Sequence, residues 1–207
     1  MDFKNVVVAG GGVLGSQIAL QCAYKGFNVT IWLRTDASID RAQPKLQRFR
    51  DIYLATLEAM KTDQRAYARG LADDPNLAPE AIDQLKEQAS KAYESLTLTT
   101  SLEEALKDAD LVIEAIAEDP KQKIDFYTNA TKYLPERTVI CTNSSTLVPS
   151  AFAEYTGRPE KYLALHFANE IWRNNTAEVM GHPGTEQVYY NQVVEFAKAI
   201  GMVPLCL

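Results

Sequence analysis

Apolar residues occur along this chain in two patterns: short continuous runs, and longer stretches in which they recur every three or four positions. A continuous run bounded by turn residues is typical of a strand buried on both faces, and the recurring pattern indicates a helix with one apolar face. The first run, residues 6–9, precedes a helical pattern that begins at Val13. Because this alternation continues along the chain, we expect an α/β fold of the Rossmann type, doubly wound around a mostly parallel sheet.

The expected strands occupy residues 6–9, 29–33, 96–99, 110–115, 138–142, 162–167, 177–180 and 202–207. Helices are expected after the first strand and at residues 38–60, 79–93, 120–134 and 186–200, with a short helix opened by a capping box at Ser101 and Glu104. The pair at 38–60 and 79–93 predicts a helical hairpin insert at about residues 38–94. Residues 170–177 hold no crossover helix, which indicates that some later strands are antiparallel.

The turn after the first strand contains three glycines, Gly10, Gly12 and Gly15, in the spacing Gly-x-Gly-x-x-Gly. The first permits a tight turn, the second lets the backbone approach a pyrophosphate, and the third lets the helix pack closely on the strand. N–H groups at the start of the helix, around Val13 and Leu14, would then hold the phosphates. We therefore predict a dinucleotide-binding domain over residues 1–207, and the alternative is an ordinary strand–turn–helix unit.

The end of the second strand bears on which dinucleotide is expected. In folds of this kind an acidic residue there usually binds the ribose hydroxyls of the adenosine. This chain has Leu33 and Arg34 at that point, and Asp36 follows only later. An arginine beside the ribose can pair with a 2′-phosphate, which would favour NADP(H) over NAD(H). Alternatively, Arg34 stacks on the adenine or faces water.

Composition narrows the class of protein. A net charge of −6 and a pI near 5.0 argue against nucleic acid or an anionic membrane as a partner. No apolar run approaches the ~20 residues that span a bilayer, and we expect no secretory signal because the first strand begins close to Met1. Cys22, Cys141 and Cys206 lie in apolar stretches, and we expect them to be core residues in a reducing, cytoplasmic compartment. We expect no metal site.

Only two histidines are candidates for a general base. His182 lies in a turn rich in glycine and proline and is interpreted as structural. His166 ends a strand at the sheet edge where ligands bind, and an antiparallel return strand could bring Glu178 beside its ring. A carboxylate there would fix the tautomer and stabilise the imidazolium, making His166 a candidate general base near neutral pH. Without such a partner, a lone histidine at a strand end is more often structural.

Other polar residues are weaker candidates for contacts with a substrate. Ser145 and Asn169 lie in loops and could hydrogen-bond a substrate oxygen, although both residue types also form turns. Arg41, Lys45 and Arg48 share one face of the helix expected at 38–60. That basic face could contact a phosphorylated substrate tail or could simply be solvated.

Several segments together are similar to one known family. The segments VVVAGGGVLGSQIA, DLVIEAIAEDPKQK and TNSSTL, and the strand ALHF followed by Glu178, resemble the NAD-binding domain of L-3-hydroxyacyl-CoA dehydrogenase. The resemblance covers nearly the whole chain, with the motifs in order. It implies an oxidoreductase of fatty acid metabolism that transfers hydride between a nicotinamide cofactor and C3 of a 3-hydroxyacyl-CoA or 3-ketoacyl-CoA.

The resemblance also implies roles for single residues. The family's catalytic His, Glu, Ser and Asn match, in that order, His166, Glu178, Ser145 and Asn169. Glu118 and Lys123 match positions near the cofactor, and Asn143, in the loop before Ser145, is counted with them. The helical insert matches one that helps to hold coenzyme A, which adds weight to the basic residues Arg41, Lys45 and Arg48.

This chain departs from the family pattern at three points. The family's acidic residue after the second strand is Leu33 here, which leaves NAD(H) and NADP(H) both open. The family's segment HFFNP reads HFANE, so Ala168 and Glu170 alter the substrate side. The family also continues into a helical domain that supplies the contacts of a homodimer, and this chain ends at Leu207. Two alternatives remain: an enzyme acting on a free hydroxy acid or diketo ester, and a non-catalytic dinucleotide-binding module.

Overall fold

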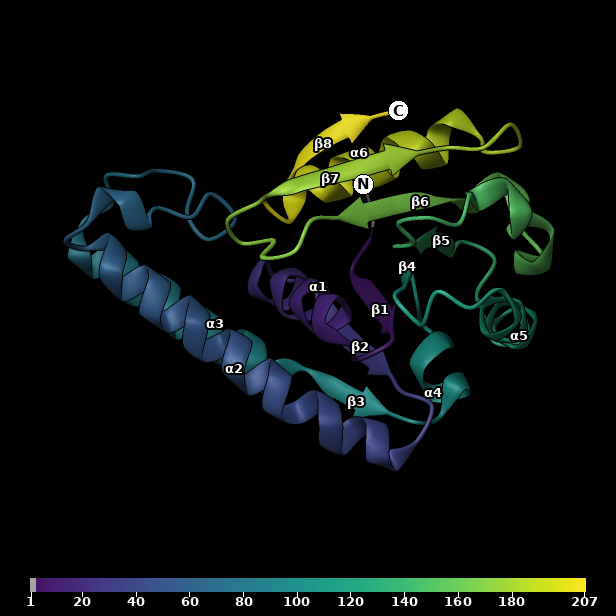
Figure 1. Ribbon diagram of the computed structural model, residues 1–207, viewed down its shortest axis with the longest axis horizontal. Coiled ribbons are helices and arrows are strands. Elements are labelled where there is room, and N and C mark those ends of the chain that lie inside the picture. The colour runs from purple at the N-terminus through teal and green to yellow at the C-terminus, as the bar shows by residue number, and fades with distance from the viewer. Residues whose placement is uncertain (1–2) are drawn as a thin grey trace.

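The computed structural model describes residues 3–207, which form one open sheet flanked by helices (Figure 1). The strands are β1 (Asn5–Ala9), β2 (Asn28–Trp32), β3 (Thr97–Thr99), β4 (Leu111–Glu114), β5 (Val139–Thr142), β6 (Tyr162–Phe167), β7 (Thr176–Met180) and β8 (Val203–Cys206). The α-helices are α1 (Val13–Tyr24), α2 (Asp36–Met60), α3 (Pro79–Ser95), α4 (Leu102–Leu106), α5 (Pro120–Ala130) and α6 (Gln187–Ala199). Short 3-10 helices are η1 (Gln64–Ala66), η2 (Pro149–Ala151), η3 (Ala153–Thr156) and η4 (Pro159–Lys161). Every strand and helix that the hydrophobic pattern predicts is present.

The order of strands across the sheet is β3-β2-β1-β4-β5-β6-β7-β8. β1 pairs in parallel with both β2 and β4, so the chain changes its direction of travel across the sheet between these neighbours. At such a switch point the connections after adjacent strands leave toward opposite faces, which opens a crevice at the carboxyl ends of the strands. β7 is antiparallel to β6, as the missing crossover helix predicts, and β8 then pairs in parallel with β7.

Two hydrophobic cores cover the two faces of the sheet. Val6 and Val8 of β1 belong to one core, and Val7 and Ala9 belong to the other, because successive side chains of a strand point to opposite faces. The first core includes residues of α1, α2, α3 and α6, and the second includes residues of α4 and α5. This arrangement confirms the doubly wound fold.

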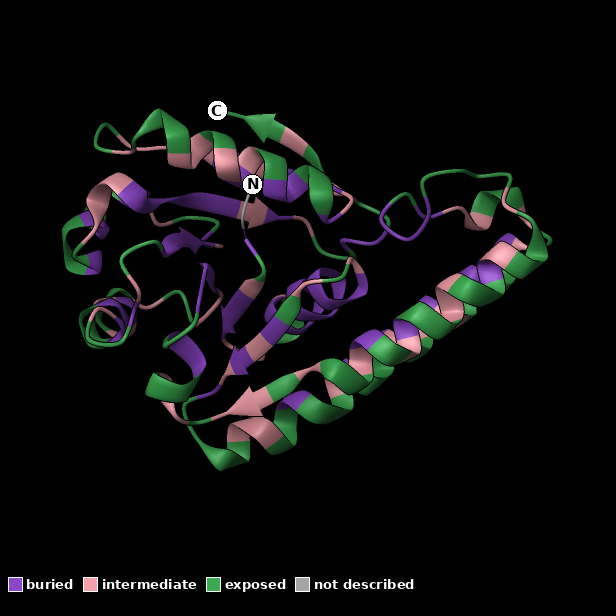
Figure 2. Cartoon of the chain, turned by 180° about the vertical axis from the view of Figure 1, so that it is seen from behind, coloured by how far each residue is buried: buried purple, intermediate pink, exposed green. Residues whose placement is uncertain are grey.

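Helices α2 and α3 form the expected hairpin, which runs along one side of the molecule (Figure 1). Its facing sides are buried and its outer sides are exposed (Figure 2). The loop between the helices returns to the body of the fold, where the Tyr24 hydroxyl donates to the carbonyl of Leu71 at 2.7 Å. Gln21 Nε2 donates to the carbonyl of Gly70 at 2.8 Å. The insert is therefore attached to the dinucleotide fold near its distal loop as well as at its ends.

Two details differ from expectation. Cys22 and Cys141 are buried, but Cys206 is exposed, because it lies on the edge strand β8. The capping box is only half formed: Ser101 Oγ accepts from the N–H of Glu104 at 3.2 Å, while the N–H of Ser101 donates instead to Thr99 Oγ1.

Two kinds of feature are absent from residues 3–207. No helix in this range combines the length and the apolar character that crossing a bilayer requires. The same range contains no group of three or more His, Cys, Asp or Glu side chains placed to hold a metal ion.

Candidate functional site

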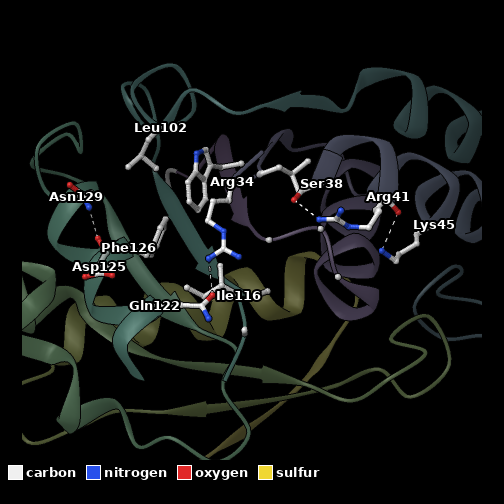
Figure 3. A pocket seen from close by; sticks show the side chains of 17 residues that line it. Arg34, Ser38, Arg41, Lys45, Leu102, Ile116, Gln122, Asp125, Phe126 and Asn129 are labelled. Carbon is white, nitrogen blue, oxygen red and sulfur yellow. Dashed lines mark hydrogen bonds between the residues drawn. The ribbon is translucent and has the colours of Figure 1, made fainter. Parts of the chain in front are cut away.

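Two adjoining pockets lie at the carboxyl ends of β1 and β4. The larger, about 520 Å³, extends toward β2 and α5 and is lined by Trp32 and Phe126 among others (Figure 3). The smaller, about 190 Å³, extends toward β5 and is lined by Glu118 and Asn143 among others. Gly12 lines both pockets. Together they follow the carboxyl edge of the sheet across the switch point, where doubly wound folds bind dinucleotides.

The glycines of the turn differ in whether the fold leaves room for a side chain. Gly10 has a φ of 117°, and a Cβ at this residue would lie 2.4 Å from the carbonyl oxygen of Ala115. A Cβ on Gly15 would lie 2.2 Å from the carbonyl oxygen of Gly10. A Cβ on Gly12 would meet no atom within 4 Å. The fold itself therefore requires Gly10 and Gly15, whereas the space at Gly12 is open to a ligand that approaches the backbone.

The start of α1 offers unpaired donors to these pockets. Gly12 is the N-cap, and the first intrahelical bond runs from the N–H of Ser16 to the carbonyl of Gly12. The N–H groups of the first turn, including those of Val13 and Leu14, have no partner within the helix, and the helix dipole favours an anion beside them. The open space at Gly12 and these donors fit the pyrophosphate of a dinucleotide.

The end of β2 places an arginine in the larger pocket. Leu33 is buried beneath the glycine turn, since a Cβ on Gly11 would lie 2.7 Å from Leu33 Cδ2. The next residue, Arg34, is exposed and lines the pocket, with its Nη1 donating to Gln122 Oε1 at 3.0 Å (Figure 3). Sequence reasoning missed Gly11 and Gln122; the run of three adjacent glycines was the available signal for the first.

The basic face of α2 is divided. Arg41 and Lys45 line the larger pocket, where Arg41 Nη2 donates to Ser38 Oγ at 2.8 Å and Lys45 Nζ donates to the carbonyl of Arg41 at 3.1 Å (Figure 3). Arg48, one turn further along, is exposed and is not among the residues that line this pocket. Helical spacing places the three on one face, but only two of them line this pocket.

The carboxylate of Glu118 organises the loop that carries Ser145. Glu118 Oε2 accepts from the Ser144 hydroxyl at 2.7 Å, and Oε1 accepts from the N–H of Ser145 at 3.0 Å. Ser144 Oγ in turn accepts from the N–H of Leu147 at 2.9 Å. The Ser145 side chain is exposed at the carboxyl end of β5. Glu118 therefore positions this loop in addition to lining the smaller pocket.

Lys123 belongs to a buried polar network around Glu114. Its Nζ lies 2.8 Å from both carboxylate oxygens, and neither side chain is more than 1% exposed. Glu114 also accepts from the hydroxyls of Tyr127 and Thr142 and from the N–H of Ile116. Burial, and then the charge of Glu114, raise the pKa of Tyr127 well above its usual value, so its hydroxyl remains a donor. Lys123 lines the smaller pocket, but its charge is already balanced by Glu114.

The antiparallel pair β6–β7 brings His166 and Glu178 together. They are directly opposed in the register, and His166 Nδ1 lies 2.8 Å from Glu178 Oε2. Because an ionised carboxylate can only accept, we assign the ring proton to Nδ1, which leaves Nε2 as the acceptor. The His166 side chain is 28% exposed, so the ring is accessible from the carboxyl edge of the sheet.

Asn143 connects the pair of His166 and Glu178 to the smaller pocket. Its side chain lines the smaller pocket, and its Oδ1 accepts from the N–H of Phe167 at 3.1 Å. The end of β5 is thereby tied to the end of β6, directly beside His166. Neither His166 nor Ser145 lines either of the two pockets described above, so the pair of His166 and Glu178 lies next to these pockets rather than within them.

Asn169 lies in the turn after β6. It is exposed, and its carbonyl accepts from Asn174 Nδ2 at 2.8 Å. The turn is held by Gln17 of α1, whose Oε1 accepts from the N–H of Glu170 at 2.8 Å, where the backbone has a φ of 58°. Gln17 is 2% exposed, and sequence reasoning missed it. The available signal was that Gln17, with Ser16 and Gln21, is polar in a mostly apolar stretch of helix.

Comparison with known protein families gives a match over nearly the whole chain. The family model for the 3-hydroxyacyl-CoA dehydrogenase NAD binding domain matches residues 5–207. The chain belongs to this family. The mitochondrial hydroxyacyl-coenzyme A dehydrogenases of Rattus norvegicus and Homo sapiens are each 27% identical over 202 residues, which cover 98% of this chain and 58% of theirs. The chain therefore spans somewhat more than half the length of these relatives.

A solved structure is more similar in sequence. It is a diketoreductase described as acting on dicarbonyl compounds, 43% identical, with a TM-score of 0.83 over 100% of this chain and 65% of that one. Family membership confirms the resemblance read from the motifs, and it identifies the chain as a Rossmann-type NAD-binding domain whose relatives are oxidoreductases.

Proposed function

We propose that this chain is the cofactor-binding and proton-transfer part of an oxidoreductase that interconverts a 3-hydroxyacyl-CoA and a 3-ketoacyl-CoA. The observation that carries the proposal is the contact between His166 and Glu178 at the carboxyl edge of the sheet, joined through Asn143 to the smaller pocket. Membership of the 3-hydroxyacyl-CoA dehydrogenase family supports the substrate class. The Ser145 side chain, exposed on the neighbouring loop, supplies a donor at the same edge.

In the oxidation, His166 Nε2 accepts the proton of the 3-hydroxyl group. Glu178 keeps the ring in the required orientation and stabilises the imidazolium that forms. Ser145 and Asn169 donate hydrogen bonds to the reacting oxygen. The nicotinamide cofactor, when bound, supplies the hydride acceptor. In the reduction, His166 returns the proton to the oxygen.

The cofactor residues follow from the two pockets. Gly10, Gly12 and Gly15, with the N–H groups of Val13 and Leu14, would hold the pyrophosphate. Arg34 lies at the adenosine end, and Glu118, Lys123 and Asn143 lie at the nicotinamide end. Arg41 and Lys45 would hold either the cofactor or the coenzyme A of the substrate, and Arg48 remains the basic residue assigned to coenzyme A alone.

A second substrate class is favoured by one comparison. The diketoreductase is 43% identical over the whole chain, which is well above the 27% identity of the hydroxyacyl-CoA dehydrogenases. Its substrates are dicarbonyl compounds. A 3-ketoacyl thioester and a diketo ester share a ketone next to a second carbonyl, so the same His166 chemistry serves both. The second candidate is therefore a reductase of a free diketo ester or a dehydrogenase of a free hydroxy acid.

The test compares the two substrates in one assay. Consumption of reduced cofactor by the 207-residue chain is measured with acetoacetyl-CoA and with a free diketo ester, alongside fluorescence titration of the cofactor. Turnover of the thioester supports the first candidate, and turnover of the free ester alone supports the second. Tight cofactor binding without turnover of either would make the chain a non-catalytic dinucleotide-binding module.

Three further properties are predictions at the level of the whole protein. They are a homodimer in the full-length form, a cytoplasmic location with no nucleic acid or membrane partner, and a place in fatty acid metabolism. Size-exclusion chromatography with light scattering would measure the first.

A further inference from the structure

Three basic side chains line the larger pocket. Arg34, from the end of β2, and Arg41 and Lys45, from α2, all line it (Figure 3). Their hydrogen bonds go to the Gln122 amide oxygen, the Ser38 hydroxyl and a backbone carbonyl, and none of these partners carries a charge. The positive charge of these three side chains is thus available to a ligand.

Many basic side chains elsewhere on the helical hairpin are paired with carboxylates. Lys61 lies 2.6 Å from Asp83, Lys91 lies 2.6 Å from Glu87, and Lys86 pairs with Glu58. Arg50 and Arg65 also contact carboxylates. The hairpin therefore neutralises many of its basic residues within itself, but not the two that reach the pocket.

Position 33, directly before Arg34, holds a leucine in place of a carboxylate that would repel a phosphate. Leu33, which follows β2, is buried beneath Gly11 and cannot receive ribose hydroxyls. The acid in the lining of this pocket is Asp125, which lies on α5 near Asn129, across the pocket from Arg41 and Lys45 (Figure 3). The first turn of α2 adds the Ser38 hydroxyl and a helix N-terminus beside Arg41, and the acid of that turn, Asp36, is not among the residues that line the pocket.

We propose that Arg34, Arg41 and Lys45, with the Ser38 hydroxyl, form a subsite for the 2′-phosphate of NADP(H). The subsite is contiguous with Gly10, Gly11 and Gly12, so an adenosine whose pyrophosphate lies on the glycine turn would present its ribose to Arg34. A phosphate monoester bound there would supply the negative charge that these cations lack as a partner. Its oxygens would accept hydrogen bonds from the guanidinium groups of Arg34 and Arg41. The proposal rests on the proposed function in one respect, namely that this pocket holds the adenosine half of a nicotinamide dinucleotide.

The same phosphate chemistry exists on coenzyme A, which carries a 3′-phosphate on its adenosine. The observations favour the dinucleotide, because the three cations line the pocket formed by the glycine turn, whereas Arg48 lies outside it. Binding of three adenosine phosphates by calorimetry distinguishes the sources: ADP, 2′,5′-ADP and 3′,5′-ADP. Fluorescence titrations with NADH and NADPH accompany them.

The expected result is that 2′,5′-ADP binds about tenfold more tightly than ADP, a ratio equivalent to about 1.4 kcal/mol. NADPH shows the same preference over NADH. Arg34→Ala and Arg41→Ala each remove most of the preference and leave ADP affinity nearly unchanged. Arg48→Ala, an exposed cation of the same helix outside the pocket, is the matched control and keeps the preference.

Other results would overturn the proposal in distinguishable ways. Equal binding of ADP and 2′,5′-ADP, with NADH binding intact, removes the 2′-phosphate subsite and leaves the proposed function in place. Preference for 3′,5′-ADP that depends on Arg41 assigns the cations to coenzyme A. Binding of neither NADH nor NADPH overturns the proposed function and this inference together.

Discussion

His166 and Glu178 face each other across the antiparallel strands β6 and β7, with the imidazole Nδ1 2.8 Å from the carboxylate Oε2. Directly opposed residues of an antiparallel pair place their side chains on the same face of the sheet. The strand register thereby fixes the orientation of the ring, and in the proposed reaction Nε2 exchanges the proton with the substrate.

Replacing His166 with Gln tests this role directly. We expect kcat to fall by about 10² to 10⁴, the usual contribution of general acid–base catalysis. NADH or NADPH affinity should not change, because His166 lines neither cofactor pocket. The measurements are steady-state kinetics and a fluorescence titration on the same preparation. Unchanged turnover would contradict the assignment of the general base.

Glu178→Gln keeps the shape of the side chain but removes its negative charge. The amide can still bond Nδ1, yet it no longer stabilises the imidazolium, so we expect a lower kcat with cofactor affinity unchanged. The pH profile of kcat gives the more specific evidence, because in the proposed mechanism loss of the carboxylate alters the ionisation of His166. A profile identical to that of the unmodified protein would indicate that Glu178 is only structural.

Gly12→Ala and Gly10→Ala separate ligand binding from folding. A Cβ at Gly12 meets no atom within 4 Å, so stability should change by less than about 1 kcal/mol while cofactor affinity falls. A Cβ at Gly10 would collide with the carbonyl of Ala115 at a φ of 117°, and we expect a loss of at least about 2 kcal/mol. Urea unfolding and cofactor titration of both variants provide the comparison. Full cofactor affinity in Gly12→Ala would show that no ligand approaches this residue.

Glu118→Gln tests whether the acid organises the Ser145 loop. In the native protein each carboxylate oxygen of Glu118 accepts one hydrogen bond, from the Ser144 hydroxyl or from the N–H of Ser145. The amide of Gln has a single, uncharged oxygen, so it cannot replace both of these charged acceptors. We expect a loss of about 1–2 kcal/mol in the free energy of unfolding. Amide hydrogen exchange should increase in the loop and remain unchanged in β1. If exchange in the loop is unaltered, Glu118 does not hold it.

The hydrogen bonds of Asp110 indicate that part of the protein's stability is lost at acid pH. Burial alone would raise the pKa of Asp110, but hydrogen bonds from Arg137 and from the N–H groups of Asn5 and Lys4 outweigh burial and lower this pKa below its usual value. A depressed folded-state pKa adds stability that is present above the unfolded pKa of about 3.9 and is lost as the pH falls through the folded value.

The measurement for Asp110 is urea unfolding of the unmodified protein and of Asp110→Asn between about pH 6 and about pH 2. The unmodified protein should be more stable at the upper end, and the difference should shrink as the pH falls below about 4. A difference that is constant over the whole range would contradict the pKa assignment.

Much of this fold and site could be predicted because the signals are local. The strands and helices follow from the period of the apolar residues, and the glycine turn follows from its spacing and its place between a strand and a helix. The pairing of His166 with Glu178 was also accessible, since a segment too short for a crossover helix implies an antiparallel return. In each case a short stretch of chain limits the possible backbone geometry.

The sequence by itself determined the order of the elements, the family and the residue types available at the carboxyl edge of the sheet. Only the tertiary structure decided that Lys123 is balanced by Glu114, that Gln17 holds the turn at Glu170, and that Arg41 and Lys45 join Arg34 while Arg48 does not. The physical reason is that burial and charge pairing depend on groups brought together from distant parts of the chain, whereas hydrophobic periodicity and turn chemistry act over a few neighbouring residues.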